Sequence, residues 1–310
     1  MARVLVTGGA GFIGSHTVER LLREGHAVTA LDNLVSGAWE NLAQARGDLT
    51  RVESDVCDAN RLADLTLRGR FDAIVHLAAW ASIIASVERP VEAHAANVGG
   101  TLAMLEAARL AGVRRVVFAS SAAVYGRTPP LPTPEDSPYQ PVSPYAAHKA
   151  EGELLCSAYR SAYGLETVIL RCFNVYGSRQ PHDSPYSGVV AVLLHRLAAG
   201  QTITVHGDGE QTRDFIHVSD VVEAMVRAAL GSDPGPGAIN VATGAGTSVL
   251  GLLTTVRAVL HADAAIVFGP ARPGDVRHSR ADIARLCERL GFTAQRDLAA
   301  GLRETIGITS

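Results

Sequence analysis

The sequence predicts an α/β protein in which a doubly wound parallel sheet is followed by a smaller α/β lobe. Apolar runs with the character of buried strands alternate with stretches of helical period, and this order builds a parallel sheet covered on both faces. After about Asn174 the pattern becomes irregular, which indicates the smaller lobe. We therefore expect a first domain over residues 1–175 and a second lobe over 176–310, with segments near 214–245 packing back on the first domain.

Each predicted element follows from a local pattern. Apolar runs predict strands at residues 3–6, 27–31, 73–77, 116–119 and 167–171, and shorter ones near 203–206 and 239–241. Helical periodicity predicts helices over 12–24, 99–111 and 146–163, and further helices near 221–230 and 249–260. Gly25 and Gly112 follow the first two helices, as glycine commonly does at a helix C-terminus. Seven of the 14 prolines lie between Thr128 and Tyr145, so a stiffened loop precedes the third helix.

Composition argues against several classes of function. The formal charge is −3, and no run of basic residues offers a surface for nucleic acid or an acidic membrane. No window approaches the roughly 18 unbroken apolar residues that span a bilayer, and no cleavable signal pattern precedes the first strand, so we expect a cytoplasmic protein. The 4 cysteines lie far apart with none in a C-x-x-C pair, which favours reduced thiols, and no metal is expected.

The first chemical motif, VTGGAGFIG, places Gly8, Gly11 and Gly14 between a strand and a helix. Glycine allows a tight turn there and lets backbone N–H groups at the helix N-terminus approach a pyrophosphate, as in Rossmann folds. Asp32 ends the next strand, about 20 residues on, where a carboxylate accepts from ribose hydroxyls. Because this carboxylate repels a 2′-phosphate and no arginine follows it, NAD is favoured over NADP. Asp55, after a third strand, fits either a contact to the adenine amine or a solvated turn.

The second motif, SPYAAHKAEG, holds the only lysine of the chain, since every other basic residue is arginine. On a helix, Lys149 and Tyr145 lie one turn apart on the same face. A phenol is a poor base at neutral pH, but a cation about 5 Å away lowers its pKa by roughly two units at an effective dielectric near 20. A compact ammonium can also bond ribose hydroxyls, which a broad guanidinium does less well. The pair therefore predicts Tyr145 as a base and Lys149 as its charged partner.

The third motif, SSAAVYG, follows the strand predicted at residues 116–119. It places Ser120 and Ser121 at the carboxyl edge of the sheet, where ligands of such folds bind. Two serines alone are more commonly part of a turn. Because Tyr145 and Lys149 follow across the proline-rich loop, we expect Ser121 to bond the same reacting oxygen and relay its proton.

These motifs, together with LDN, HLAA, FNVYG, GDGEQTRDFIHV and RPGD, resemble the extended short-chain dehydrogenase/reductase family over nearly the whole chain. Within it, the sequence is most similar to the nucleoside-diphosphate-sugar epimerases. The resemblance implies a catalytic trio of Ser121, Tyr145 and Lys149, an NAD-binding first domain and a lobe that binds a UDP-sugar. It implies an NAD pocket of Gly8, Gly11, Phe12, Ile13, Gly14, Asp32, Asn33, Ser36, Gly37, Asp55, Val56, Leu77, Ala78, Ala79, Asn97, Ser120, Tyr145 and Lys149. It implies a substrate site of Ala81, Ser121, Asn174, Gly188, Val189, His206, Arg213, Arg272, Asp275 and Ser279.

The resemblance also implies roles within the substrate site. Asn174 would contact the diphosphate or sugar, His206 would stack near the uracil, and Asp275 would hold ribose hydroxyls. Arg213 and Arg272 would hold the phosphates, since each guanidinium can make paired charge-assisted bonds. Simpler alternatives are a salt bridge between Arg213 and its neighbour Asp214, and an ordinary strand position for His206.

The reaction implied is a transient oxidation. Tyr145 would take the C4 hydroxyl proton as the sugar is oxidised, the 4-keto sugar would turn over while its nucleotide stays anchored, and reduction would follow on the opposite face. No net redox occurs, so NAD would stay bound between turnovers. The family likeness also implies a homodimer formed by helices 99–111 and 146–163, although the apolar face of the second, with Leu154 and Leu155, fits packing on the sheet equally well.

Three departures from the family pattern narrow the substrate. Ala122 and Ala123 stand where dehydrating members carry an acidic pair, so a 4,6-dehydratase is disfavoured. Ala81 replaces a lysine of the enteric-type epimerases, which leaves that wall roomier or neutral. Ser279 stands where epimerases restricted to non-acetylated sugars carry tyrosine, and with Gly188 it would open space for an N-acetyl group, unless it lies on a surface turn. We therefore hypothesise that UDP-GlcNAc and UDP-GalNAc are accepted alongside UDP-Glc and UDP-Gal.

Three other functions stay open. A UDP-glucuronate 4-epimerase or decarboxylase would use the same trio with a cradle for the carboxylate. A keto-sugar reductase would consume NADPH, which Asp32 disfavours. A catalytically silent NAD-sensing protein would need the cofactor pocket but not Ser121, Tyr145 and Lys149.

Overall fold

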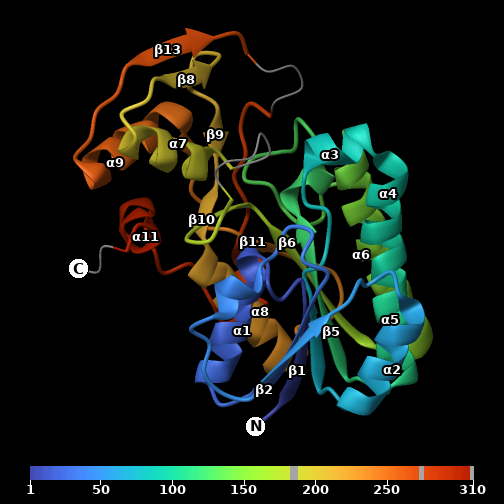
Figure 1. The fold of residues 1–310 in the computed structure, drawn as a ribbon. Coiled ribbons are helices and arrows are strands. Elements are labelled where there is room, and N and C mark those ends of the chain that lie inside the picture. Colours follow the sequence, from blue (N-terminus) through green and yellow to red (C-terminus); the bar gives the residue numbers. More distant parts are fainter. Residues whose placement is uncertain (182–187, 272–275, 308–310) are drawn as a thin grey trace.

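The computed structural model describes residues 1–181, 188–271 and 276–307, and all statements below concern these residues (Figure 1). Its centre is a seven-stranded parallel sheet with the strand order β11-β6-β5-β4-β1-β2-β3. The strands are β1 (Arg3–Thr7), β2 (Ala27–Asp32), β3 (Leu49–Glu53), β4 (Ala73–His76), β5 (Arg115–Ser121), β6 (Glu166–Cys172) and β11 (Ala238–Val241). The predicted doubly wound parallel sheet is confirmed.

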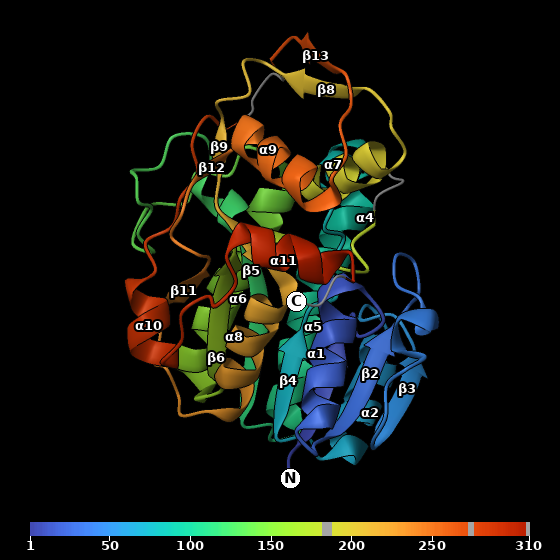
Figure 2. The ribbon, with the colours of Figure 1, turned by 90° about the vertical axis from the view of Figure 1, so that its left-hand side faces the viewer.

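Helices cover both faces of this sheet (Figures 1 and 2). One face is covered by α1 (Phe12–Arg23), α8 (Val218–Leu230) and α10 (Ala284–Leu290), whose apolar side chains form one core with the strands. The other face is covered by α2 (Ala59–Gly69), α5 (Gly100–Leu110) and α6 (Pro144–Tyr163), which enclose a second core. Short segments join these layers, namely η1 (Trp39–Leu42), α3 (Ile83–Glu88), α4 (Pro90–His94), the π-helical η2 (Ala95–Gly99) and η3 (Ala122–Tyr125).

The helix predicted over 99–111 differs at its start. The α-helical part begins at Gly100 and is preceded by the π-helical turn η2, in which Asn97 is buried. Asp55 was predicted to follow a third strand, and β3 occupies that place. The sequence of β3, LTRVE, contains no apolar run of the kind that predicts a buried strand. The reason is its edge position, because three of its five residues are exposed.

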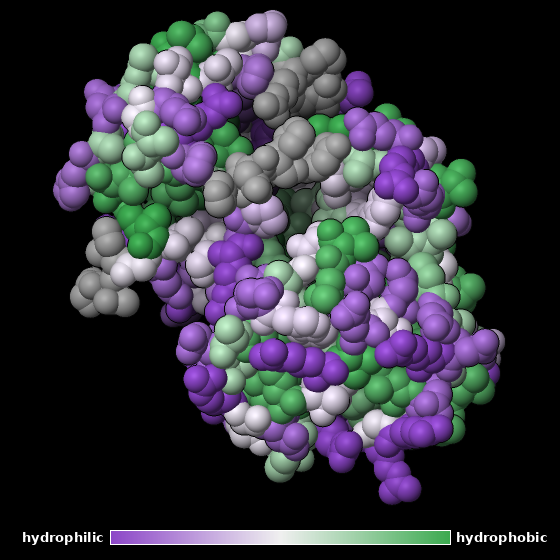
Figure 3. Space-filling view, viewed as in Figure 1, coloured by the Kyte–Doolittle hydropathy of each residue, from purple (hydrophilic) through white to green (hydrophobic). Residues whose placement is uncertain are grey.

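A smaller lobe lies above the carboxyl edge of the sheet (Figure 1). Its helices α7 (Val189–Ala198), α9 (Val249–Leu260) and α11 (Leu298–Thr305) share a third core. Its strands form short pairs, namely β8 (Ile203–His206) with β13 (Ile266–Gly269), β9 (Thr212–Arg213) with β12 (Thr247–Ser248), and β7 (Asn174–Tyr176) with β10 (Phe215–His217). Figure 3 shows that the surface is hollowed between this lobe and the larger body.

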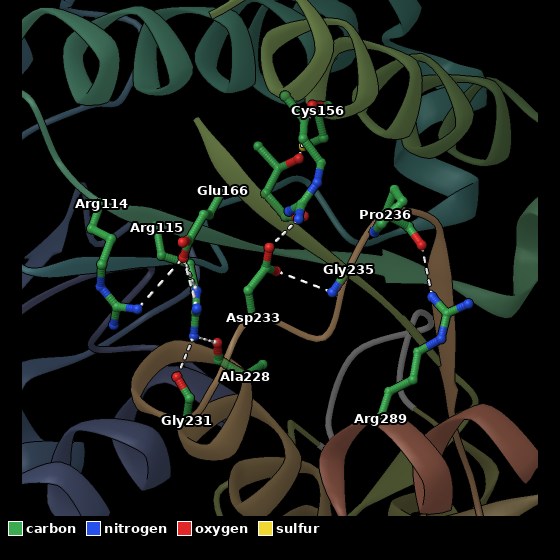
Figure 4. Close-up of polar contacts among 12 residues, drawn as sticks. Arg114, Arg115, Cys156, Glu166, Ala228, Gly231, Asp233, Gly235, Pro236 and Arg289 are labelled. Atoms are coloured by element: carbon green, nitrogen blue, oxygen red, sulfur yellow. Dashed lines mark hydrogen bonds and ion pairs between the residues drawn. The ribbon is translucent and has the colours of Figure 1, made fainter. Parts of the chain in front are cut away.

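Strand β11 and helix α8 come late in the chain but belong to the central sheet and its cover. Arg115, a buried arginine at the start of β5, ties α8 to the sheet (Figure 4). Arg115 donates through Nε to Glu166 at 2.8 Å and through Nη1 to the carbonyls of Ala228 and Gly231 at 3.0 and 2.8 Å. Since Arg115 is fully buried, these bonds compensate the burial of its charge.

The strand order reverses between β1 and β4. In open α/β sheets ligands bind in the crevice outside the carboxyl ends of the strands at such a reversal. The glycine turn after β1 and the segment after β4 therefore border the predicted ligand crevice. None of the helices that the structure describes is long and apolar enough to cross a membrane.

Candidate active site

The turn after β1 brings backbone close to backbone. Gly8 has φ +67° and a Cβ on it would lie 2.8 Å from the backbone nitrogen of Ala78. A Cβ on Gly14 would lie 1.9 Å from the carbonyl oxygen of Gly8. Gly11 caps α1 in extended backbone, and Phe12 and Ile13 begin the helix, half-buried against the core. Side chains at Gly8 and Gly14 would therefore collide with backbone and displace the turn at the helix N-terminus.

Asp32 ends β2 and is 6% exposed. Its Oδ2 accepts from the backbone N–H of Ala10 at 2.9 Å and its Oδ1 from that of Leu34 at 2.8 Å. Gly37 packs against this carboxylate, where a Cβ would approach Oδ2 to 2.8 Å. Ser36 lies exposed in the same loop. The carboxylate is therefore fixed in place at the carboxyl end of its strand.

The next loop holds a second carboxylate. Asp55 accepts from the side-chain amide of Asn33 at 2.7 Å and from the backbone N–H of Cys57 at 2.8 Å. Burial raises the pKa of Asp55, but these hydrogen bonds outweigh it, so the pKa lies below its ordinary value. Val56 is buried and faces Gly100, at which a Cβ would meet it at 2.6 Å.

The segment after β4 forms another wall of the crevice. Leu77, Ala78 and Ala79 are half-buried there. Asn97, 3% exposed, accepts from the backbone N–H of Trp80 at 2.7 Å and donates to the carbonyl of Trp80 at 3.2 Å. Both amide atoms of Asn97 thus hold the wall in position.

Ser121, Tyr145 and Lys149 converge at the carboxyl end of β5 and the start of α6. Ser121 is the last residue of β5, and a hydrogen bond links its side chain to that of Tyr145. Tyr145 follows Pro144, the first residue of the helix, and its backbone N–H donates to Ser86 Oγ at 3.1 Å. Lys149 Nζ lies 5.9 Å from the centroid of the Tyr145 ring and donates to the carbonyl of Ala119 at 2.7 Å. The predicted trio is therefore brought together.

The pKa of the Tyr145 phenol shifts in the opposite direction to the one predicted from the sequence. Among the protein's own groups, burial is the largest influence and raises the pKa of Tyr145 to about 12, while the hydrogen bond with Ser121 acts in the opposite direction. Burial likewise lowers the pKa of Lys149 to about 8. The expected two-unit lowering by one ammonium neglected this cost of burying charge.

The two adjacent serines have separate surroundings. Ser120 is 4% exposed and its hydroxyl donates to the buried carboxylate of Glu153. Glu153 also accepts from Tyr139 at 2.9 Å and from Arg171 Nη2 at 2.7 Å. The Ser120 hydroxyl is therefore engaged inside the protein, beside the trio.

Glu153 and Arg171 were not predicted as part of this site. The one available signal was the position of Glu153, one helical turn after Lys149.

The residues expected around the substrate lie on the lobe and on the loops facing it. Asn174 begins β7 with its side chain exposed, and Ala81 is exposed in the loop before α3. Gly188 caps α7, which begins at Val189, and a Cβ on Gly188 would lie 2.8 Å from Gln180 Nε2. His206 ends β8, with Nδ1 3.2 Å from the carbonyl of Pro270.

Arg213 and Ser279 lie next to each other through Thr212. The Ser279 N–H donates to the Thr212 carbonyl at 3.1 Å, and Arg213 Nη1 donates to the same carbonyl at 2.8 Å. Asp214 accepts hydrogen bonds from Thr243, Gly244 and Ala281.

Two other residues expected in the substrate site, Arg272 and Asp275, lie outside the described residues.

Comparison with known proteins identifies this arrangement. Residues 4–242 match the sequence profile described as the NAD dependent epimerase/dehydratase family. The chain belongs to that family. The UDP-glucose 4-epimerase of Mycolicibacterium smegmatis is 46% identical over 308 residues, which span 98% of this chain and 97% of the relative.

Solved structures of the family superpose closely. The chain is similar to UDP-N-acetylglucosamine 4-epimerase from Methanobrevibacter ruminantium in complex with UDP-N-acetylmuramic acid, with a TM-score of 0.94, 38% identity and coverage of 99% of this chain and 97% of the other. It is also similar to Thermus thermophilus UDP-glucose 4-epimerase in complex with NAD, with a TM-score of 0.90, 38% identity and coverage of 99% and 98%.

The cofactor of this family is NAD, and the residues of the crevice fit it. Glycine at positions 8 and 14 permits the close backbone packing of the turn before α1, because Cβ atoms there would collide with backbone, and such a turn presents the helix N-terminus to a pyrophosphate. The Asp32 carboxylate stands at the end of β2, where ribose hydroxyls can donate to it and a 2′-phosphate would be repelled. The chain is therefore an NAD-dependent enzyme of the nucleotide-sugar epimerase type.

Proposed function

We propose that this enzyme interconverts UDP-hexoses by 4-epimerisation, acting on UDP-Glc and UDP-Gal and also on UDP-GlcNAc and UDP-GalNAc. The observation that supports it most is the convergence of Ser121, Tyr145 and Lys149 beside the NAD crevice. This trio provides an acid-base group, a hydroxyl partner and a cation at one place, which removal and return of a hydroxyl proton requires.

In this proposal Tyr145 takes the proton of the C4 hydroxyl and later returns it. NAD, when bound in the crevice, would supply the oxidising and then the reducing equivalent at C4. Ser121 bonds the same sugar oxygen and keeps it within reach of the phenol. Positive charge near the phenol stabilises its ionised form and so acts against the burial that raises its pKa. Lys149 provides such charge from within the protein, and its ammonium can also bond ribose hydroxyls.

The lobe would hold the nucleotide while the sugar turns. We propose that residues 1–175 bind NAD and residues 176–310 bind the UDP-sugar. Arg213 would contact the diphosphate, His206 the uracil side, and Asn174 the diphosphate or sugar. The NAD contacts we propose are Gly8, Gly11, Phe12, Ile13, Gly14, Asp32, Asn33, Ser36, Gly37, Asp55, Val56, Leu77, Ala78, Ala79, Asn97 and Ser120.

Acceptance of N-acetylated sugars rests on small side chains in the substrate site. Ser279 stands beside Thr212, and Gly188 stands at the start of α7. We expect Ser279→Tyr to abolish turnover of UDP-GlcNAc while turnover of UDP-Glc stays within about threefold, because a ring would fill space that only the acetyl group uses. Equal losses for both sugars would contradict this role.

We also propose that the enzyme forms a homodimer through α5 and α6. Leu102, Leu110, Leu154 and Tyr163 expose 43%, 60%, 57% and 58% of their surface on these helices. Large apolar side chains on neighbouring helices are typical of a protein interface. Sedimentation at micromolar concentration distinguishes the dimer from a monomer.

The decisive experiment incubates the purified protein with UDP-Glc, UDP-GlcNAc and UDP-GlcA separately, without added NAD, and resolves the products by chromatography. The proposal requires UDP-Gal from the first and UDP-GalNAc from the second. Product from UDP-GlcA alone would replace it with the glucuronate 4-epimerase or decarboxylase. No product from any of them would favour a reductase or another nucleotide.

A further inference from the structure

A chain of hydrogen bonds crosses the protein behind the cofactor crevice and is centred on His76. This histidine ends β4 and is 2% exposed, and the threonines on its two sides, Thr7 and Thr101, are 0% and 2% exposed. His76 Nδ1 lies 2.8 Å from Thr7 Oγ1, and Nε2 lies 3.1 Å from Thr101 Oγ1. His76 is the first residue of the HLAA motif, and no role was predicted for it.

The partners of the two threonines determine where the imidazole proton lies. The Thr101 hydroxyl donates its single hydrogen to the carbonyl of Asn97 at 2.6 Å. It can therefore only accept from His76, so Nε2 carries the proton. Nδ1 is then an acceptor, the Thr7 hydroxyl donates to it, and Thr7 Oγ1 accepts from the backbone N–H of Ala78 at 3.3 Å. The donor and the acceptor of every hydrogen bond in this network are therefore determined.

Both ends of this chain reach the wall of the NAD crevice. At one end Thr7 holds the backbone of Ala78, against which Gly8 packs. At the other end Thr101 holds the carbonyl of Asn97, whose side chain makes two hydrogen bonds to the backbone of Trp80. The segment from Ala78 to Trp80 is thus fixed at two points by groups that His76 connects.

A second contact of His76 leads toward Lys149. The imidazole stacks on the ring of Phe118, with centroids 6.0 Å apart and an interplanar angle of 28°. Lys149 Nζ lies 5.0 Å from the centroid of the same ring. The Phe118 ring also packs closely against helix α6, because a Cβ on Gly152 would lie 2.4 Å from Phe118 Cζ. Any shift of the Phe118 ring would therefore move Lys149 or the helix that carries it.

We propose that His76 is a positioning residue, locked as the neutral Nε2–H tautomer, that holds the Ala78–Trp80 wall of the NAD pocket and, through Phe118, the ammonium of Lys149. The proposal rests on the role proposed for Lys149 in its second part. Burial, together with a smaller effect of the Lys149 charge, lowers the pKa of His76 to about 3, which agrees with a neutral ring. A proton on Nδ1 would face Thr7 as a second donor and break the chain.

Two substitutions each remove one of the two hydrogen bonds made by the His76 ring. His76→Asn keeps an acceptor near the place of Nδ1 and removes the donor to Thr101, whereas His76→Gln keeps a donor near the place of Nε2 and removes the acceptor for Thr7. His261→Asn is the matched control, because His261 is exposed in a left-handed conformation that asparagine also adopts. Thr101→Val is a milder variant that removes both hydrogen bonds of the Thr101 hydroxyl, the one from His76 and the one to the Asn97 carbonyl, and leaves the imidazole ring in place.

The single lysine makes the test direct. In protein labelled only at lysine side chains, Lys149 gives the only lysine signal, and its methylene protons report whether they lie near the face of the Phe118 ring. We expect ring-current shielding of this signal in the wild type and in His261→Asn, and its loss in His76→Asn and His76→Gln. We also expect NAD affinity, measured without any sugar, to fall about tenfold in both His76 variants. Nitrogen-15 spectra of histidine-labelled wild type should show His76 as the Nε2–H tautomer.

An Nδ1–H tautomer or a cationic His76 at neutral pH would overturn the proposal even if both His76 variants failed to fold. An unchanged Lys149 signal together with unchanged NAD affinity in His76→Asn, His76→Gln and Thr101→Val would overturn it as well. None of these measurements uses a UDP-sugar. If the wild type did not turn over UDP-Glc, the proposed function would fail while the positioning role of His76 would still be decided.

Discussion

The carboxyl edge of the sheet and the substrate lobe are built in different ways. At the sheet edge, Asp32, His76 and Lys149 are 6%, 2% and 6% exposed, and each is held by hydrogen bonds to backbone groups or to buried threonine hydroxyls. On the lobe, Asn174 is exposed and Arg213 half-buried, on strand pairs only two or three residues long. Charge is therefore fixed in a low-dielectric setting at the sheet edge, whereas the lobe offers adaptable contacts. This difference suits chemistry at the first region and recognition at the second.

Removing a buried charge next to the sheet edge gives the largest expected effect. Glu153→Gln leaves the guanidinium of Arg171, 3% exposed, without its carboxylate, and breaking such a buried pair costs about 3–5 kcal/mol of unfolding free energy. The matched control is Glu151→Gln, two residues earlier on α6, whose carboxylate is 44% exposed and should lie within about 0.5 kcal/mol of the wild type. Denaturant unfolding measures both, and equal values would contradict the contrast.

The buried lysine makes stability depend on pH. Because the pKa of Lys149 is lowered from 10.5 to about 8, the folded protein releases its proton while the unfolded chain still binds one. The cost of burying the charge is therefore full below pH 8 and is relieved as the pH rises from 8 toward 10.5. Relative to Lys149→Met, the wild type should gain about 3 kcal/mol of unfolding free energy across this window. A constant difference between the two proteins from pH 7 to 10 would contradict the burial of this charge.

Ser121→Ala tests the chemical side of the comparison at a smaller scale. Removing the hydroxyl that we propose bonds the reacting oxygen should lower kcat by about 10²-fold and leave KM for the UDP-sugar nearly unchanged. Ser82→Ala is a control, because this serine caps α3 through its bond from Ala85 and belongs to no proposed contact. If KM rose while kcat held, Ser121 would belong to recognition.

Arg213→Ala tests the recognition side and has the smallest expected effect. Loss of the guanidinium that we propose contacts the diphosphate should raise KM about tenfold with kcat preserved, since in this proposal the lobe contacts the substrate equally before and during reaction. Arg68→Ala is the matched control, because this side chain is 80% exposed on α2. A fall in kcat without a change in KM would contradict the assignment of chemistry to the sheet edge and of substrate recognition to the lobe.

The parts of this site that could be predicted from sequence are those set by local spacing. The turn of Gly8 and Gly14 follows from where a strand meets a helix, and the pairing of Tyr145 with Lys149 follows from one turn of helix. The direction of the Tyr145 pKa shift could not be predicted, because it depends on burial contributed by distant segments. The hydrogen-bond partner of Ser120 lies 33 positions away in the sequence, and the two partners of His76 lie 25 and 69 positions away. These contacts likewise could not be predicted from local spacing.

The most direct test of the account measures turnover and binding on the same Tyr145→Phe sample. Because the phenol is proposed to move the C4 proton while the lobe holds the nucleotide, conversion of UDP-Glc to UDP-Gal should fall by about 10³-fold or more. Bound NAD and the affinity for UDP should match the wild type. Conversion within tenfold of the wild type would show that another group moves the proton, and the proposed role of the sheet edge would be wrong.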